Sequence, residues 1–176
     1  MSLFSARPRI TGLVLAGLVF WLDQWLKQQV AGPWGLRELG DHLDLLPFFD
    51  LTRTHNYGVS LGLLLANSME MRWGLVALTT AIAAIVFVWL LRERKLGDIV
   101  PLALVLGGAL GNILDRIKFG YVLDYADFHI GDFRPFLIFN LADAAITVGV
   151  VIILARSFLI REKTATEPAG TPATEN

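Results

Sequence analysis

The sequence predicts a mainly α-helical, polytopic membrane protein with four transmembrane helices, a small external β-sheet and a further external loop or short helix. Hydrophobic residues make up 55% of the 176 residues and charged residues only 18%, whereas a soluble domain carries about a quarter charged residues. Mean hydropathy is +0.57. Four separate apolar segments approach the roughly 20 residues that a helix needs to cross the hydrocarbon.

The four predicted spans differ in their polar content. The first resembles a signal peptide, because Arg7 and Arg9 precede its apolar run, but no small-residue cleavage site follows, which indicates a retained helix. The second contains no ionisable residue, the third ends in polar residues, and the fourth carries Asp143 near its start. The predicted spans cover residues 10–28, 73–91, 99–117 and 136–159.

Three segments lie outside these spans. In residues 30–72, the alternation of Leu51, Arg53 and His55 with polar neighbours predicts a short curved sheet on the outer surface. Residues 118–135 form a second external segment, rich in aromatic residues and Asp, that we expect to be a loop or short helix. Residues 1–163 are expected to form a single domain, and the polar tail 164–176 is expected to be disordered.

Positive charge predicts the orientation of the helices. Arg92, Arg94 and Lys95 fill the short connection between the second and third spans, and further basic residues flank the outer ends of the first and fourth. An even number of spans places all of these on one side, which the positive-inside rule assigns to the cytoplasm. Both termini are therefore expected to be cytoplasmic.

The polar residues of the spans converge on the opposite, outer face. With the first and third spans running outward and the fourth inward, residues late in the former and early in the latter share one depth. Because Asn112, Asp115 and Arg116 stand at i, i+3 and i+4, they share a helix face. A single polar cluster at one depth indicates a site, whereas a transport path would place ionisable groups deeper. Its members are Asp23, Asn56, Asn112, Asp115, Arg116, Asp124, Asn140 and Asp143.

Simpler structural roles compete for several of these residues. Asp23 and Lys27, at i and i+4, are also typical of an interfacial ion pair with a snorkelling lysine. For Asp115, a supporting role is the better interpretation. Asp143, taken alone, is compatible with a structural polar anchor. Gly107, Gly108 and Gly111 are typical of close helix packing in lipid.

Five motifs in this order resemble the lipoprotein signal peptidase family, also called signal peptidase II. The resemblance runs from the first span to the fourth, and the polar tail lies outside it. The motifs are Asp23-Gln24-Trp25-Leu26-Lys27, Asn56-Tyr57-Gly58-Val59-Ser60-Leu61, the segment from Gly107-Gly108 to Asn112-Ile113-Leu114-Asp115-Arg116, Val122-Leu123-Asp124-Tyr125, and Phe139-Asn140-Leu141-Ala142-Asp143.

The resemblance implies an aspartic endopeptidase of the bacterial cytoplasmic membrane. Its substrates would be diacylglyceryl-modified prolipoproteins, cut just before the lipidated cysteine, and its site would lie near the periplasmic face. The catalytic pair would be Asp124 and Asp143. The chain itself is expected to act as a monomer in membrane lipid; its sequence shows no cofactor or metal site, and its net charge of −1 gives no indication of a nucleic-acid partner. Supporting positions would be Asp23, Asn56, Gly108, Asn112, Asp115, Arg116 and Asn140.

Other chemistries remain open at this stage. Gly58-Val59-Ser60-Leu61-Gly62 matches G-x-S-x-G, and His55 and His129 lie on the same side, so a serine protease is an alternative. The absence of cysteine excludes a thiol nucleophile, and the scattered histidines lack the H-E-x-x-H pattern of a zinc protease. Outside the enzymes, the alternatives are a small proton-coupled transporter or a lipid-binding scaffold.

Overall fold

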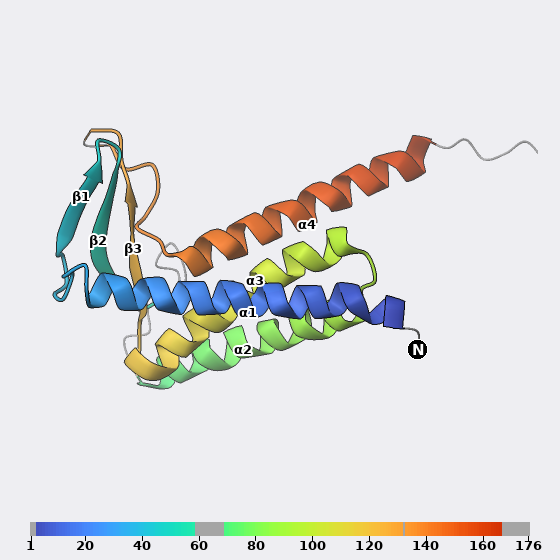
Figure 1. The fold of residues 1–176 in the computed structure, drawn as a ribbon, viewed down its shortest axis with the longest axis horizontal. Helices are drawn as coiled ribbons and strands as arrows, with labels where there is room; N and C mark the ends of the chain where they lie inside the picture. Colours follow the sequence, from blue (N-terminus) through green and yellow to red (C-terminus); the bar gives the residue numbers. More distant parts are fainter. Residues whose placement is uncertain (1–2, 59–68, 132, 167–176) are drawn as a thin grey trace, which may run out of the picture.

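The computed structural model describes residues 3–58, 69–131 and 133–166 and contains four long helices (Figure 1). Each helix contains a segment long and apolar enough to cross a membrane, so the four-span prediction is confirmed. The start of the first helix, the end of the fourth helix and the connection between the second and third helices lie at the end of the bundle remote from the sheet (Figure 1). The helices are α1 (Leu3–Ala31), α2 (Met69–Arg92), α3 (Leu96–Phe119) and α4 (Leu141–Thr166).

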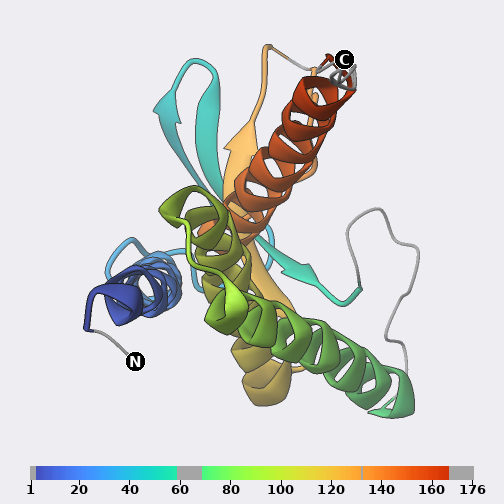
Figure 2. The ribbon, with the colours of Figure 1, turned by 90° about the vertical axis from the view of Figure 1, so that its right-hand side faces the viewer.

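Helix α3 is the centre of the bundle. The other three helices pack around it, and they splay apart from one another when seen along the bundle (Figure 2). Glycines allow this close approach: a Cβ on Gly107 would lie 2.5 Å from the backbone oxygen of Ala16, and one on Gly108 would lie 2.5 Å from that of Ala142. The prediction that these glycines serve close helix packing is confirmed.

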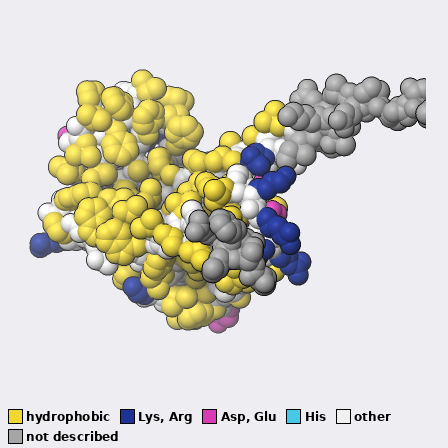
Figure 3. All heavy atoms as spheres, turned by 45° about the vertical axis from the view of Figure 1, so that its right-hand side comes forward, with side chains coloured by type: hydrophobic (Ala, Val, Ile, Leu, Met, Phe, Trp, Pro, Cys, Tyr) yellow, Lys and Arg dark blue, Asp and Glu magenta, His cyan; other side chains and the backbone are white. Residues whose placement is uncertain are grey.

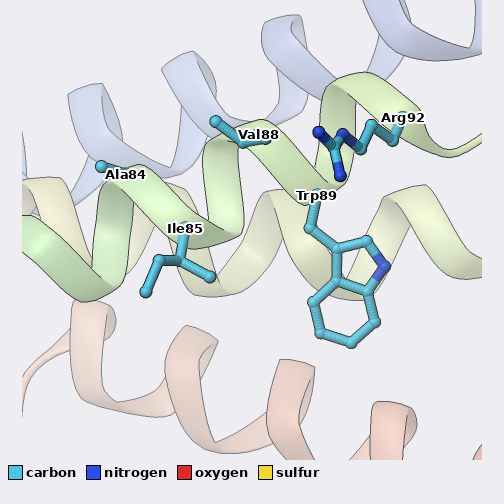
Figure 4. Close-up of a pocket in the computed structure, with 5 residues that line it drawn as sticks. All are labelled: Ala84, Ile85, Val88, Trp89 and Arg92. Atoms are coloured by element: carbon cyan, nitrogen blue, oxygen red, sulfur yellow. The ribbon is translucent and has the colours of Figure 1, made fainter.

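The outer surface of the bundle is apolar, as expected for a surface in contact with lipid tails (Figure 3). A groove of about 440 Å³ runs along the outside of α2, with Ile85 and Trp89 projecting from the helix beside it (Figure 4). Arg92 lines the end of this groove that lies near the α2–α3 connection. The groove lies away from the polar residues described below, and we assign it to lipid contact.

A three-stranded antiparallel sheet covers the other end of the bundle (Figure 1). Strands β1 (His42–Leu46) and β2 (Phe49–Asn56) form a hairpin, and β3 (Val122–Phe128) pairs with β2. The second external segment, expected to be a loop or short helix, contributes strand β3 to the sheet instead. β3 is the most buried strand, because it lies between β2 and the helix ends and contacts α3 and α1.

A glycine cap ends α3, and an extended pairing with β3 delays the start of α4. Gly120 adopts φ 85°, and its N–H donates to the carbonyl of Arg116 at 3.1 Å, which ends α3 and turns the chain into β3. Helix α4 begins at Leu141 and not at residue 136 as expected, because Phe139 pairs with Ala126 of β3 in extended form. α4 continues to Thr166, so the first three residues of the expected tail are helical, and residues 167–176 lie outside the described part.

Candidate active site

The polar residues predicted to converge do so, at the end of the bundle that the sheet covers. Asp23 of α1, Asn112, Asp115 and Arg116 of α3, Asp124 of β3 and Asn140 before α4 are all buried, and hydrogen bonds join them through shared partners. Asn56 and Asp143 complete the set at its more accessible side. Gly108 lies apart from the hydrogen bonds and contributes the close contact between α3 and α4.

Asp124 is held by two side-chain amides. Its Oδ2 accepts from Asn56 Nδ2 at 3.1 Å, and its Oδ1 accepts from Asn140 Nδ2 at 2.6 Å. The orientation of each amide is set by the backbone, since Asn56 Oδ1 accepts from Gly58 N at 3.0 Å and Asn140 Oδ1 accepts from Asp143 N at 2.9 Å. Both amides must therefore present their N–H groups to Asp124.

Asp143 stands in the first turn of α4 and takes part in its cap. Asn140 Oδ1 accepts from the Asp143 N–H at 2.9 Å, and Asp143 Oδ2 accepts from the Asn140 N–H at 3.3 Å. This reciprocal pattern is a capping box, and it explains why α4 begins directly after Asn140. The other carboxylate oxygen, Oδ1, accepts from Asn112 Nδ2 at 2.8 Å. Asp143 is half-buried, whereas Asp124 is only 2% exposed.

Asn140 therefore joins the two aspartates directly, through its side chain to Asp124 and through its backbone to Asp143. Burial and then the neighbouring charge of Asp143 raise the pKa of Asp124 to about 7. A buried carboxyl group beside a second carboxylate ionises only at a cost, so Asp124 keeps its proton to a higher pH than an exposed aspartate does.

A buried ion network lies behind this pair. Lys27 Nζ is 2.8 Å from Asp23 Oδ2 and 2.8 Å from Asp115 Oδ2, and it is 5% exposed. The ion pair between Asp23 and Lys27, given as an alternative interpretation, is present, but the lysine does not snorkel to the interface, because residues of α3 cover it. Gln24 Nε2 adds hydrogen bonds to Asp115 Oδ1 at 2.8 Å and Asp23 Oδ2 at 3.2 Å. The supporting role expected for Asp115 agrees with these contacts.

Lys27 and Gln24 were not among the predicted site residues, although both belong to the first of the five motifs. Apart from that motif, the signal for Lys27 in the sequence is its position one helical turn after Asp23. That spacing occurs in surface pairs as well as in buried ones. What distinguishes Lys27 is its second carboxylate, Asp115, which comes from a helix 88 positions away in the chain.

Arg116 directs its guanidinium toward β2 and the start of the segment that follows it. Its Nη2 donates to the carbonyl of Gly58 at 2.7 Å, and its Nη1 donates to that of Asn112 at 3.4 Å. Within the described residues, the buried Nε has no hydrogen-bond partner. The planar guanidinium therefore keeps one donor available beside the aspartates.

The residues of the competing chemistries are engaged elsewhere or lie outside the described part. His55 stacks on Tyr121 with ring centroids 3.7 Å apart, and burial followed by the charge of Arg53 lowers its pKa. His129 Nε2 lies 2.9 Å from Asp50 Oδ2, on the sheet. Ser60 falls outside the described residues. Within those residues, no group of His, Asp or Glu is arranged to hold a metal ion.

Comparison with known proteins identifies the family. The family model described as signal peptidase (SPase) II matches residues 15–159. A lipoprotein signal peptidase from Sphingopyxis alaskensis is 51% identical over 152 residues, covering 86% of this chain and 87% of the relative. One from Rhizorhabdus wittichii is 53% identical over 154 residues, covering 88% and 89%.

Solved structures agree with the sequence comparison. A bacterial membrane enzyme determined by the in meso method at 2.3 Å resolution has a TM-score of 0.71 and 27% identity, covering 92% of this chain and 94% of that one. A second, at 1.9 Å resolution, has a TM-score of 0.70 and 30% identity, covering 83% and 91%. The chain therefore belongs to the signal peptidase II family and is a multi-pass membrane peptidase.

Proposed function

We propose that this peptidase removes the signal peptide from diacylglyceryl-modified prolipoproteins by cutting just before the lipidated cysteine, with Asp124 and Asp143 as the catalytic pair. The observation that carries the proposal is the bridge through Asn140, which joins the two carboxylates from different elements. They lie where the sheet meets the ends of apolar helices, a place that suits a scissile bond at the membrane surface.

In this mechanism Asp124 and Asp143 share one proton, and that proton supplies the chemistry of the pair. The ionised carboxylate takes a proton from water as the water oxygen attacks the scissile carbonyl carbon. The neutral carboxyl donates a hydrogen bond to the carbonyl oxygen, and a proton passes to the leaving amine when the C–N bond breaks. A pKa of about 7 for Asp124 supports one proton on the pair at neutral pH.

The surrounding donors fit this division of labour. Asn112 and Asn140 hold the carboxylates in place, so that little reorganisation accompanies the attack. The Nε of Arg116, which has no hydrogen-bond partner among the described residues, is suited to a backbone carbonyl of the bound substrate. Asp23 and Asp115 bind the protein's own backbone and side chains, which supports structural roles for them.

The lipid of the substrate would hold the scissile bond at the right depth. Each buried CH₂ is worth about 0.8 kcal/mol, so two acyl chains restrict the search for the site to the plane of the membrane. The large apolar surface around the bundle can accommodate such chains (Figure 3). A peptide without the diacylglyceryl group has no comparable reason to reach a site at this interface.

We further propose that the enzyme resides in the bacterial cytoplasmic membrane with both termini in the cytoplasm and the site near the periplasmic face. Arg92 ends α2, and Arg94 and Lys95 follow it before α3, at the end of the bundle remote from the sheet (Figure 1), which supports this orientation. Reporter fusions at Gly131 should report the periplasm and fusions at Lys95 the cytoplasm. The reverse result would place the site on the cytoplasmic side.

The proposed substrate is tested by offering the purified protein the same precursor with and without its diacylglyceryl group. At equal concentration in the same vesicles, we expect a gel shift for the modified precursor only. Equal cleavage of both forms would refute the requirement for lipid. The Ser60→Ala variant serves as a control on the nucleophile: it should keep substantial activity, and its complete inactivity in folded form would favour the serine mechanism.

A further inference from the structure

The buried ion network around Lys27 is connected to both proposed catalytic residues, Asp124 and Asp143. Lys27, on α1, touches neither aspartate of the pair by any hydrogen bond found in the described residues. We propose that Lys27 is a positioning residue that sets the separation of Asp124 and Asp143 by holding Asp23 and Asp115 together. The inference rests on the proposed role of Asp124 and Asp143 as the catalytic pair.

The first connection runs through Asp115 to β3. Asp115 Oδ2, which lies 2.8 Å from Lys27 Nζ, also accepts a hydrogen bond from the backbone N–H of Leu123 at 3.3 Å. Leu123 is the residue directly before Asp124. Asp115 therefore ties the backbone of β3 to the lysine immediately beside one member of the pair.

The second connection runs through Asp23 to α4 and mirrors the first. Asp23 Oδ2 binds Lys27 Nζ at 2.8 Å, while its Oδ1 accepts from the backbone N–H of Ala142 at 3.1 Å. Ala142 is the residue directly before Asp143. The two carboxylates bound to one ammonium group thus each hold the backbone position that precedes a proposed catalytic aspartate.

A third contact orients the amide that binds Asp143. Lys27 Nζ donates to Asn112 Oδ1 at 3.3 Å, and Asn112 Nδ2 donates to Asp143 Oδ1 at 2.8 Å. Because an amide has one oxygen and one nitrogen on opposite sides, fixing the oxygen against a cation points the nitrogen toward Asp143. Lys27 thereby also holds this donor in the required direction.

The charge and the hydrogen-bonding capacity of Lys27 fit positioning and not proton transfer. An ammonium group has three N–H donors, and here the three acceptors are Asp23, Asp115 and Asn112. None is left for a substrate. Without the cation, two buried carboxylates that now share it would repel each other, and the backbone segments bound to them would move apart.

The test replaces Lys27 with methionine, which keeps the length of the side chain and removes the charge. A misplacement of about 1 Å costs on the order of 100-fold in rate, so kcat for a lipid-modified precursor should fall about 100-fold. KM should stay within about threefold, because none of the contacts of Lys27 faces the substrate. The matched control is Arg156→Met, which breaks the α3–α4 ion pair with Asp98 (2.9 Å) and should leave kcat unchanged.

A second substitution separates repulsion from a general loss of packing. In Lys27→Met/Asp115→Asn, the asparagine removes one of the two repelling charges, and its amide oxygen can still accept from the N–H of Leu123. We expect kcat at least tenfold above that of Lys27→Met alone. If Lys27→Met does not accumulate in folded form, Lys27→Gln takes its place, because the amide can still donate to one carboxylate, and the same fall in kcat is expected.

A folded Lys27→Met or Lys27→Gln variant with wild-type kcat would overturn the inference, as would a loss carried by KM alone or no recovery in the double variant. Asp124→Asn and Asp143→Asn are assayed beside these variants. If either is active, the proposed catalytic pair is wrong. If both are inactive while Lys27→Met cleaves normally, only the positioning role of Lys27 fails.

Discussion

The raised pKa of Asp124 predicts that this residue makes the protein less stable as the pH rises. Its ordinary value is 3.8, and burial together with Asp143 brings it to about 7 in the folded protein. Between pH 3.8 and about pH 7, the folded state therefore keeps Asp124 protonated, whereas the unfolded state has already released that proton. Stability from this group is greatest below pH 3.8, falls as the pH rises toward 7, and changes no further above it. Asp124→Asn removes this dependence.

The magnitude follows from the separation of the two pKa values. About three pKa units correspond to about 4 kcal/mol of destabilisation at alkaline pH, of which about 3 kcal/mol develops between pH 5 and pH 8. Asparagine loses a hydrogen bond from Asn56 or Asn140, which lowers its stability by about 1–3 kcal/mol at every pH. The comparison between the two pH values is free of this constant loss.

The assay is thermal unfolding of both proteins in the same detergent at pH 5 and pH 8. Between these values, Tm of the wild type should fall relative to that of Asp124→Asn by roughly 6–12 °C, using about 2–4 °C per kcal/mol for a chain of this size. Titrating groups that do not interact with Asp124 are common to the two proteins and cancel. Parallel changes in Tm would refute the raised pKa, and with it the shared proton at neutral pH.

Three further predictions concern activity and packing. Gly108→Ala should lower stability by about 1–3 kcal/mol and reduce cleavage, because its Cβ would meet the backbone oxygen of Ala142, whereas Gly17→Ala, with open space around it, should do neither in the same unfolding and cleavage assays. The rate of cleavage by the wild type should fall above about pH 7, approaching tenfold per pH unit, as the shared proton is lost; a rate that stays flat to pH 9 would contradict this. A chelator should not reduce the rate, and a loss that added zinc restores would overturn the mechanism based on carboxylates and water.

The spans and the polar cluster could be predicted because both depend on local composition. A run of about 20 apolar residues is a strong signal by itself. Once the helices alternate in direction, Asp23, Asn112 and Asp143 must lie at the same end of the bundle. No knowledge of side-chain packing was needed for that step, which is why the cluster in the structure matches the expected set.

Long-range pairing and exact helix ends could not be predicted in the same way. Strand β3 joins the sheet by pairing with β2, as in Leu51 with Ala126, and no local pattern specifies a partner so distant in the chain. Residues 136–140 are apolar enough to suggest helix, although the capping pair Asn140 and Asp143 carried the true signal for a start at Leu141. Lys27 could not be assigned, because its burial depends on Asp115.

The central claim is that Asp124 and Asp143 together hydrolyse the peptide bond. Its most direct test is the initial rate of cleavage of a diacylglyceryl-modified precursor by purified wild-type protein and by the single variants Asp124→Asn and Asp143→Asn, each shown to be folded by its thermal transition. We predict that either substitution lowers the rate at least about 1,000-fold, because the remaining carboxyl group has no partner with which to share a proton. A folded Asp124→Asn or Asp143→Asn protein that cleaves the precursor at the wild-type rate would contradict the claim.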